Sequence, residues 1–198
     1  MTPMPDSLDA VWTHAWARLL AGARGRNDPF HQGVLATAMA EGPQARYAVL
    51  RAVDPGAATV AFHTDGRSPK CGQLRGDPRA AWCFFGHGEQ VRLSGSVQLH
   101  PDGADADAAW EANRRSARQN YAGANPPGTA VRLPGEGGPP GLDSAPLDVA
   151  GMSLARGHFV FARFTVTALD WLSLSAAGHA RAGFERTGTG WQSTWLTP

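Results

Sequence analysis

The feature that most constrains this fold is a series of short β-prone segments separated by turn residues. Residues 44–51 and 58–64 form one pair, and the segment AVDPGA between them contains an Asp-Pro-Gly turn. Residues 80–85 and 89–99 form a second pair across the tripeptide GHG. In the last segment valine and leucine alternate with polar residues, which is typical of a strand with one buried face. Antiparallel strand pairs are therefore the expected framework of the fold.

Helical patterns flank these strands. Residues 7–22 carry an apolar stripe, and Ser7 is the expected N-cap. A second helix is expected over residues 29–39, because Asp28 can cap it and proline is tolerated in the first turn. A third helix, rich in alanine and arginine, is expected over about residues 102–121.

The C-terminal part begins with a Gly- and Pro-rich stretch, residues 123–151, which has no clear period and predicts a long loop that extends to about residue 156. Strands resume at 157–174, and the strands at 182–187 and 191–196 enclose a TGTG hairpin turn. Antiparallel pairs with interspersed helices predict a mainly β, α+β fold, namely a closed or nearly closed β-barrel with flanking helices.

Composition limits the classes of function. A chain of 198 residues with 42% hydrophobic residues is long enough for one core, so one domain over residues 1–198 is expected, with a helical N-terminus at about 7–40. A formal net charge of +1 disfavours a nucleic-acid partner. No apolar run approaches the ~18 residues of a membrane span, and the N-terminus lacks a secretory pattern. With only two cysteines, Cys71 and Cys83, these features predict a cytoplasmic protein.

The stretch HTDGRSPK ends in Lys70, which is the only lysine of the chain. A strand is expected to end at Thr64, and Ser68 then lies at a helix N-cap position with proline after it. A helix N-terminus presents free N–H groups and a partial positive charge, to which this loop adds hydroxyls and the cations of Arg67 and Lys70. The stretch therefore indicates a site for a phosphate monoester. An ordinary strand–turn–helix with solvated charges is the alternative that the stretch alone leaves open.

Four motifs occur in order along the chain: RYAVLR, FHTDGRSPK, DPRAAWCFF and GEQVRLSG. The segments LDWLSLSAAGHARAGFER and GWQSTWLTP follow near the C-terminus. Together these motifs resemble the pyridoxamine 5'-phosphate oxidase family, the FMN-binding split barrels, over roughly residues 30–100 and 158–198. The resemblance implies a six-stranded antiparallel Greek-key split barrel. It also implies a homodimer with FMN at two equivalent sites between the subunits.

The resemblance further implies which residues bind the cofactor. They are Arg46, Arg51, His63, Thr64, Arg67, Ser68, Lys70, Gln90, Trp171 and Arg181. The chemistry fits, because a phosphate dianion favours cations at a helix start and a flavin ring favours an amide at its edge and an aromatic side chain on its face. Pro69 stands in the place of one phosphate-binding arginine, and Arg67 is the candidate replacement. Taken singly, Trp171 also fits a core residue, and Arg46 and Arg51 also fit solvated strand ends.

The residues that hold the substrate phosphate in the vitamin B6 oxidases are matched less well. Trp110 and Arg114 approximate an aromatic residue and an arginine of the middle helix, whereas Arg118 stands where a serine is expected. Near the C-terminus His179 matches, but Ala177 replaces an arginine, which removes a bidentate phosphate donor. Pyridoxamine phosphate is therefore a doubtful substrate, and His179 and Arg114 are the candidate catalytic residues.

Three hypotheses for the function follow. The first is an FMN-dependent oxidoreductase that acts on an unidentified small molecule, with the flavin carrying the chemistry. The second is a flavin-binding protein without turnover. The third is a haem-binding split barrel with ligands among His63, His87, His158 and His179, which would leave the phosphate loop without a role. The sequence indicates no metal site, and it does not distinguish FMN from a related deazaflavin.

Overall fold

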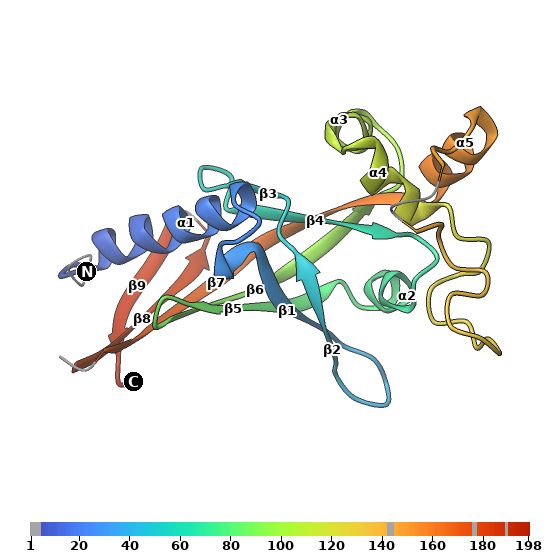
Figure 1. Cartoon of the computed structure of the whole chain (residues 1–198). Helices are drawn as coiled ribbons and strands as arrows, with labels where there is room; N and C mark the ends of the chain where they lie inside the picture. Colours follow the sequence, from blue (N-terminus) through green and yellow to red (C-terminus); the bar gives the residue numbers. More distant parts are fainter. Residues whose placement is uncertain (1–4, 142–144, 176–177, 189) are drawn as a thin grey trace. The chain divides into compact units, whose positions relative to one another are not determined.

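The computed structural model describes residues 5–141, 145–175, 178–188 and 190–198. The helices of this described part are α1 (Leu8–Arg24), η1 (Pro29–His31), α2 (Pro69–Gly76), α3 (Ala104–Ala112), α4 (Arg115–Arg118), η2 (Gln119–Tyr121) and α5 (Val149–His158), where η marks a 3₁₀ turn (Figure 1). Its strands are β1 (Gln32–Thr37), β2 (Gln44–Val49), β3 (Ala52–Asp54), β4 (Thr59–Asp65), β5 (Arg79–Gly86), β6 (Glu89–His100), β7 (Phe159–Ser175), β8 (Gly178–Thr187) and β9 (Gly190–Leu196). No described helix is long and apolar enough to cross a membrane.

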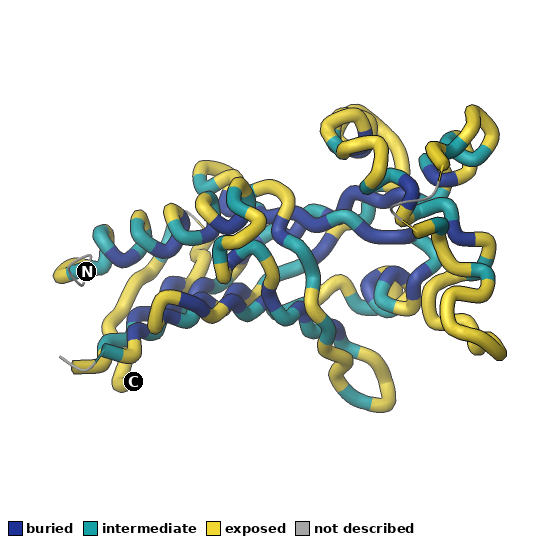
Figure 2. Tube along the Cα trace, in the orientation of Figure 1, coloured by how far each residue is buried: buried dark blue, intermediate teal, exposed yellow. Residues whose placement is uncertain are grey.

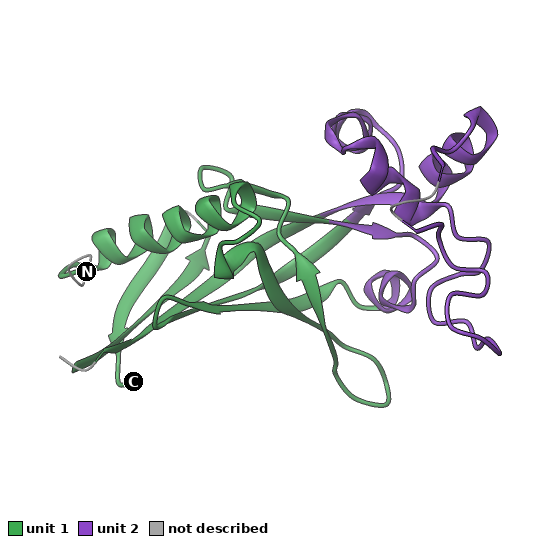
Figure 3. Ribbon diagram, viewed as in Figure 1, with its two compact units in different colours: residues 1–62, 77–98, 163–198 green, residues 63–76, 99–162 purple. Residues whose placement is uncertain are grey.

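The chain divides into two compact units. Unit 1 comprises residues 1–62, 77–98 and 163–198, and unit 2 comprises residues 63–76 and 99–162 (Figure 3). Each unit is assembled from segments that are distant in the sequence. The expectation of a single domain stays a prediction.

One sheet contains the nine strands of the described residues. Its order is β2-β1-β5-β6-β7-β4-β3, with β8 paired to β7 and β9 paired to β8. The pairings with a described register are antiparallel. The mainly β, antiparallel fold with flanking helices is therefore confirmed. Six strands and a closed barrel are not confirmed, because the described strands number nine and their path ends at β2 and β3 without joining.

The hairpin of β5 and β6 is the framework of unit 1, as the sequence predicted. His87 and Gly88 form its two-residue turn, and both have positive φ (57° and 75°), as a tight hairpin turn requires. Opposed residues in neighbouring strands share a face of the sheet. The row Leu35–Trp82–Leu93 is fully buried and defines what we call the inner face, with the outer face on the other side.

Helix α1 covers part of unit 1 with its apolar stripe. Ser7 caps it as expected, and its side chain accepts a hydrogen bond from the backbone N–H of Ala10. The ring of Trp12 lies 5.3 Å from that of Phe184 in β8 and 4.7 Å from that of Trp191 in β9, measured between ring centroids. Figure 2 shows that the helix is buried along one side and exposed along the other. The helix is therefore fixed by aromatic packing on β8 and β9.

The helix expected over residues 29–39 is wrong beyond its first turn. Asp28 does cap it, accepting a hydrogen bond from the N–H of Phe30, but the helix stops at His31 and strand β1 follows. The strand wins because it pairs with β2 on one side and β5 on the other. It also places Gly33 against the rings of Trp82 and Phe84, where a side chain would not fit. Tertiary pairing thus overrides a valid helix-start signal.

The helix expected over residues 102–121 is also wrong, because it is broken into α3, α4 and η2. The backbone of Asn113 is extended (φ −71°, ψ 137°), which ends α3. The guanidinium of Arg118 donates to the carbonyls of Glu111 and Asn113, at 2.8 and 3.1 Å. These bonds satisfy carbonyl groups that the helix break leaves without helical partners.

Two further expectations need correction. The loop expected to reach residue 156 ends at Asp148, which caps helix α5 by accepting from the N–H of Gly151 at 2.7 Å. The expected turn after β2 contains strand β3, which pairs with β4, so the Asp-Pro-Gly turn closes a β3–β4 hairpin. The β8–β9 hairpin is confirmed, and β8 begins earlier than expected, at Gly178.

Replacing Gly33 with alanine should destabilise the fold. A Cβ atom there would lie 2.7 Å from the rings of Phe84 and Trp82, which are both fully buried. We expect a loss of ~1–3 kcal/mol in the free energy of unfolding, measured by urea denaturation. Gly157→Ala in α5 is the matched control, because a Cβ added there would meet nothing within 4 Å and alanine favours helix. Equal stabilities of the two variants would contradict the packing argument.

Candidate functional site

The phosphate loop of unit 2 brings three predicted residues together. Lys70 Nζ donates to Thr64 Oγ1 at 2.9 Å and to Ser68 Oγ at 3.0 Å. The two hydroxyl oxygens lie 3.3 Å apart. Thr64 and Ser68 are 5% and 4% exposed, so the fold holds these hydroxyls in place. An ammonium group and two fixed hydroxyls at the start of α2 are suited to a phosphate group.

Short-range bonds build this loop from its own sequence. The N–H of Ser68 donates to the carbonyl of Asp65 at 3.0 Å, and the N–H of Cys71 donates to the carbonyl of Ser68 at 2.9 Å. The Cys71 thiol, buried below, also donates to the Asp65 carbonyl at 3.4 Å. These bonds turn the chain sharply from β4 into α2. The expected strand–turn–helix is therefore confirmed as structure, and its role as an anion site stays a prediction.

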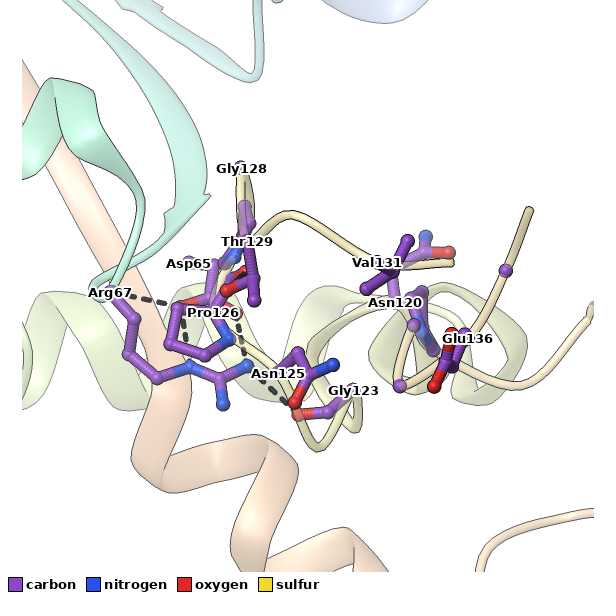
Figure 4. A pocket seen from close by; sticks show the side chains of 15 residues that line it. Asp65, Arg67, Asn120, Gly123, Asn125, Pro126, Gly128, Thr129, Val131 and Glu136 are labelled. Carbon is purple, nitrogen blue, oxygen red and sulfur yellow. Dashed lines mark hydrogen bonds and ion pairs between the residues drawn. The ribbon is translucent and has the colours of Figure 1, made fainter. Parts of the chain in front are cut away.

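Arg67 lies in the same loop but is bonded within the protein. Its guanidinium forms a salt bridge with Asp65 at 2.7 Å, and it also donates to the carbonyls of Gly123 and Ala124 (Figure 4). The hydrogen bond to Asp65 raises the pKa of Arg67 above its already high ordinary value. The structure thus gives Arg67 protein partners, and its expected role at the phosphate stays a prediction.

His63, the last predicted residue of unit 2, lies among aromatic side chains. Its ring centroid is 5.0 Å from that of Phe159 and 6.1 Å from that of Phe161. Its Nδ1 lies 3.3 Å from Nδ2 of Asn113, at the break between α3 and α4. Its position is therefore set by packing on the first residues of β7.

Gln90 lies on the outer face of unit 1. A row on this face crosses four strands and consists of Tyr47, Val34, Cys83 and Arg92. Phe85, two residues after Cys83, points to the same side, and Gln90 is directly opposite Phe85. Tyr47 is 73% exposed and Phe85 is 61% exposed. The outer face therefore presents large aromatic side chains to the surroundings.

Arg181 also belongs to the outer face, where it shares a carboxylate. Asp170 Oδ2 accepts from Arg181 at 2.8 Å and from Arg92 at 2.9 Å. The hydrogen bond to Asp170 raises the pKa of Arg181. Arg92 is opposite Cys83 in the outer-face row, so this charged cluster continues the row that carries the exposed Tyr47.

Trp171 lies on the inner face and is fully buried. Its indole N–H donates to Glu89 at 3.3 Å, and the same carboxylate accepts from His14 at 2.7 Å and from Arg18 at 3.3 Å. Burial raises the pKa of Glu89, but hydrogen bonds from His14, Arg18 and Trp171 outweigh it and leave that pKa below its ordinary value. The contact of Trp171 with a cofactor stays a prediction.

Sequence reasoning missed this carboxylate network. Glu89 directly precedes Gln90 in the motif GEQVRL, and His14 and Arg18 are four residues apart on α1, which places them on one helix face. These two spacings were the available signals. The partners are separated by 71 to 82 positions in the chain, so no local pattern joins them.

Arg46 and Arg51 complete the predicted set in unit 1. Arg46 is opposite Leu35 and donates to the hydroxyl of Thr37 at 2.6 Å. Burial lowers its pKa. Arg51 has an exposed side chain, and its backbone N–H donates to the carbonyl of Ala61. In unit 1 the predicted residues thus lie on both faces of the sheet, whereas in unit 2 the phosphate loop is compact.

Of the residues expected near a substrate, some already bond to other side chains and the others are exposed. Trp110 is buried, with the guanidinium of Arg118 5.2 Å from its ring centroid, and Arg118 also pairs with Glu111. Arg114 is exposed at the start of α4, and His179 is exposed in β8. Ala177 lies outside the described residues.

The candidate haem ligands fall in both units. In unit 2 His158 Nδ1 lies 2.8 Å from the carbonyl of Tyr121, and His63 is packed against the aromatic residues of β7. In unit 1 His87 forms the turn of the β5–β6 hairpin. No group of three metal-ligating side chains gathers among the residues that the structure describes.

Comparison with known proteins gives a family match. The model of the family described as pyridoxamine 5'-phosphate oxidase matches residues 26–135. A curated pyridoxine/pyridoxamine 5'-phosphate oxidase from Anaeromyxobacter dehalogenans (strain 2CP-C) is 41% identical over 87 residues. The matched region is 42% of this chain and 42% of that relative, so it spans less than half of the relative's length.

Two solved structures share the fold over nearly the whole chain. A pyridoxamine 5'-phosphate oxidase-related, FMN binding protein from Nostoc punctiforme PCC 73102 has a TM-score of 0.75 and 24% identity, with 100% of both chains covered. PhzG from Burkholderia lata 383, in complex with tetrahydrophenazine-1-carboxylic acid, has a TM-score of 0.67 and 20% identity, with 98% of this chain and 94% of that chain covered. At these identities the likeness concerns the fold.

Replacing Glu89 with glutamine should lower stability at neutral pH and flatten its acid dependence. The pKa of Glu89 is lower in the folded chain than its ordinary value of 4.5, so its stabilising effect is present above pH 4.5 and is lost as the pH falls through the folded pKa. We expect a loss of ~1–3 kcal/mol in the free energy of unfolding at pH 7, and a smaller further loss than in the native chain between pH 5 and 3. Denaturant unfolding at several pH values measures both.

The control for this variant is Glu41→Gln, which removes one exposed carboxylate from a turn. It should leave both the stability at pH 7 and the acid dependence unchanged. The same loss in both variants would show that the buried network does not stabilise the fold.

Proposed function

Because the chain belongs to the pyridoxamine 5'-phosphate oxidase family, we propose that it binds FMN with the phosphate in the loop of Thr64, Ser68 and Lys70. The observation that carries this proposal is the convergence of the Lys70 ammonium and two buried hydroxyls at the start of α2. This donor set fits a phosphate dianion, because it combines one cation, two hydroxyl groups and the positive end of helix α2. A single lysine also matches one phosphate better than two.

The flavin ring is proposed to lie between two copies of the chain in a homodimer, against the outer face of unit 1 of the second copy. Gln90 offers an amide that can donate to or accept from the ring edge, and Arg181, bonded to Asp170, offers a cation on the same face. Tyr47 and Phe85 supply apolar surface that a second copy of the chain would cover. This arrangement corresponds to the six-stranded split barrel with two equivalent FMN sites that the resemblance implies, and we propose both for this chain.

The proposed activity is that of an oxidoreductase on an unidentified small molecule. Bound FMN supplies hydride acceptance, while the chain supplies binding and orientation. The side chains that could bind a substrate phosphate form a poor site, because Arg118 already pairs with Glu111 and lies over the ring of Trp110. A small molecule other than pyridoxamine phosphate is therefore the proposed substrate, and His179 and Arg114 are the residues proposed to face it.

A flavin-binding protein without turnover is the second candidate, and the engagement of Arg118 favours it. Anaerobic mixing of the flavin-loaded protein with nicotinamides and amines separates the two functions. Rapid bleaching of the flavin absorbance by one donor supports the oxidoreductase, and no bleaching by any donor supports the second candidate.

Replacing Lys70 with methionine should weaken FMN binding about ten- to hundredfold, because one charge-assisted bond to the phosphate is lost. Flavin fluorescence quenching during a titration measures the dissociation constant. Arg26→Gln, in an exposed turn of unit 1, removes the same charge and should bind FMN like the native chain. An undiminished affinity of the Lys70 variant would refute the proposed phosphate site.

Placing glutamate at both Tyr47 and Phe85 should convert a dimer into monomers, because the partner would have to bury two new charges. Sedimentation velocity measures the oligomeric state, and the same variant should bind FMN more weakly. Val149→Glu is the control, since Val149 is 88% exposed in α5 of unit 2. A monomeric native chain would overturn the proposed dimer.

A further inference from the structure

Arg67 lies in the phosphate loop, but its side chain bonds to other parts of the protein. Its own backbone N–H donates to Asp65 Oδ1 at 2.8 Å, and its Nε donates to the same oxygen at 3.0 Å. Its Nη2 donates to Asp65 Oδ2 at 2.7 Å. The Asp65 carboxylate is largely buried, and the guanidinium therefore lies in a two-pronged pairing with an acceptor that water reaches poorly.

The other side of the guanidinium bonds to a distant segment. Nη2 donates to the carbonyl of Gly123 at 3.0 Å, and Nη1 donates to the carbonyl of Ala124 at 3.3 Å. These carbonyls begin the Gly- and Pro-rich segment of residues 123–139, which we call the strap. Figure 4 shows Arg67 between Asp65 and the first residues of the strap. One side chain thus bonds the phosphate loop to a segment 56 positions further along the chain.

The strap is a folded loop whose ends meet. The N–H of Asn125 donates to the carbonyl of Gly137 at 2.8 Å, and a Cβ on Gly123 would lie 3.1 Å from the nitrogen of Pro139. A further contact reaches the phosphate loop, because a Cβ on Gly128 would lie 3.4 Å from Cγ of Pro69, the first residue of α2. The strap therefore approaches the start of α2, where the anion is proposed to bind.

A cavity lies beside Arg67, where the strap bonds to the phosphate loop. It has a volume of about 310 Å³ and is lined by Asp65, Arg67 and residues of the strap, including Glu136 (Figure 4). The lining holds two carboxylates and one guanidinium, and the guanidinium is already bonded to Asp65 and to the two carbonyls, so the lining disfavours an anion. The side of Arg67 that faces the strap is consequently a poor place for a phosphate.

We propose that Arg67 is a positioning residue that clasps the strap to the phosphate loop, so that anion binding at Lys70 and ordering of the strap favour each other. This inference rests on the proposed phosphate site. A bound anion stabilises the already folded loop of residues 64–70 against local opening, and Arg67 passes this stabilisation to the strap because it belongs to that loop and bonds to the strap. By linkage the strap in its clasped form then strengthens anion binding by the same factor.

The clasp and a direct ligand predict opposite results for Arg67→Gln. If Arg67 is a clasp, amide hydrogen exchange across residues 123–139 should become about tenfold faster without any ligand, because the two carbonyl bonds are lost. FMN should then bind less tightly by a smaller factor than in Lys70→Met. If Arg67 contacts the phosphate directly, affinity should fall as far as in Lys70→Met, while exchange in the ligand-free strap stays at the native rate, which overturns the clasp.

A second variant guards against a general loss of structure. Arg67→Lys keeps the charge and should pair with Asp65, but one ammonium cannot also reach both strap carbonyls. We expect faster exchange confined to the strap, with native exchange in β5 and β6 of unit 1. Native exchange in the strap of this variant overturns the inference.

The matched control is Arg132→Gln, which removes an exposed arginine from within the strap. Its backbone N–H, not its side chain, bonds to Glu136, so strap exchange should match that of the native chain.

In the native chain, saturating FMN should slow exchange across residues 123–139, and inorganic phosphate should do so more weakly. No protection by bound FMN overturns the coupling, whereas failure of FMN to bind the native chain at all would instead refute the proposed function.

Discussion

The interaction on which the proposed site depends is the convergence of one ammonium group and two hydroxyls at the junction of β4 and α2. A chain with a net charge of +1 has no general attraction for anions, so it must concentrate charge locally. Thr64 and Ser68 are almost completely buried, and their oxygens meet Lys70 without the cost of ordering flexible side chains. The Cys71 thiol below them ties the turn to Asp65. The loop is therefore arranged for a ligand by its own backbone bonds.

The parts of the fold that sequence reasoning predicted correctly are those fixed by short-range chemistry. Ser7 and Asp28 are caps because their side chains accept bonds from N–H groups two or three residues away. The β5–β6 hairpin forms around two residues that tolerate positive φ. The predicted lengths of two helices were wrong. Residues 32–37 become a strand because two neighbouring strands pair with them, and this information lies elsewhere in the chain.

The same division applies to the candidate site. Thr64, Ser68 and Lys70 lie within seven consecutive residues, so their convergence follows from a strand, a turn and a helix start. The strap partners of Arg67 and the partners of Glu89 could not be predicted, because they lie 56 to 82 positions away. Sequence reasoning assigned Arg67 to the phosphate without these strap carbonyls, and that assignment stays a prediction. Likewise, the bond from the Trp171 indole N–H to Glu89 is seen only in the structure, and the contact of Trp171 with a cofactor stays a prediction.

Two buried carboxylates, Asp65 in unit 2 and Glu89 in unit 1, show how the chain holds the side chains around them in place. Asp65 is paired with an arginine that also bonds the strap, and Glu89 accepts from α1 and from β7 at once. An apolar pair of the same volume would often stabilise a fold as well or better, because burying charge is costly. It would not fix direction, whereas a carboxylate that accepts two or three bonds defines the orientation of each donor. The charged groups therefore fix orientation: Asp65 orients Arg67 within the phosphate loop, and Glu89 orients Trp171 and helix α1 on the inner face of unit 1.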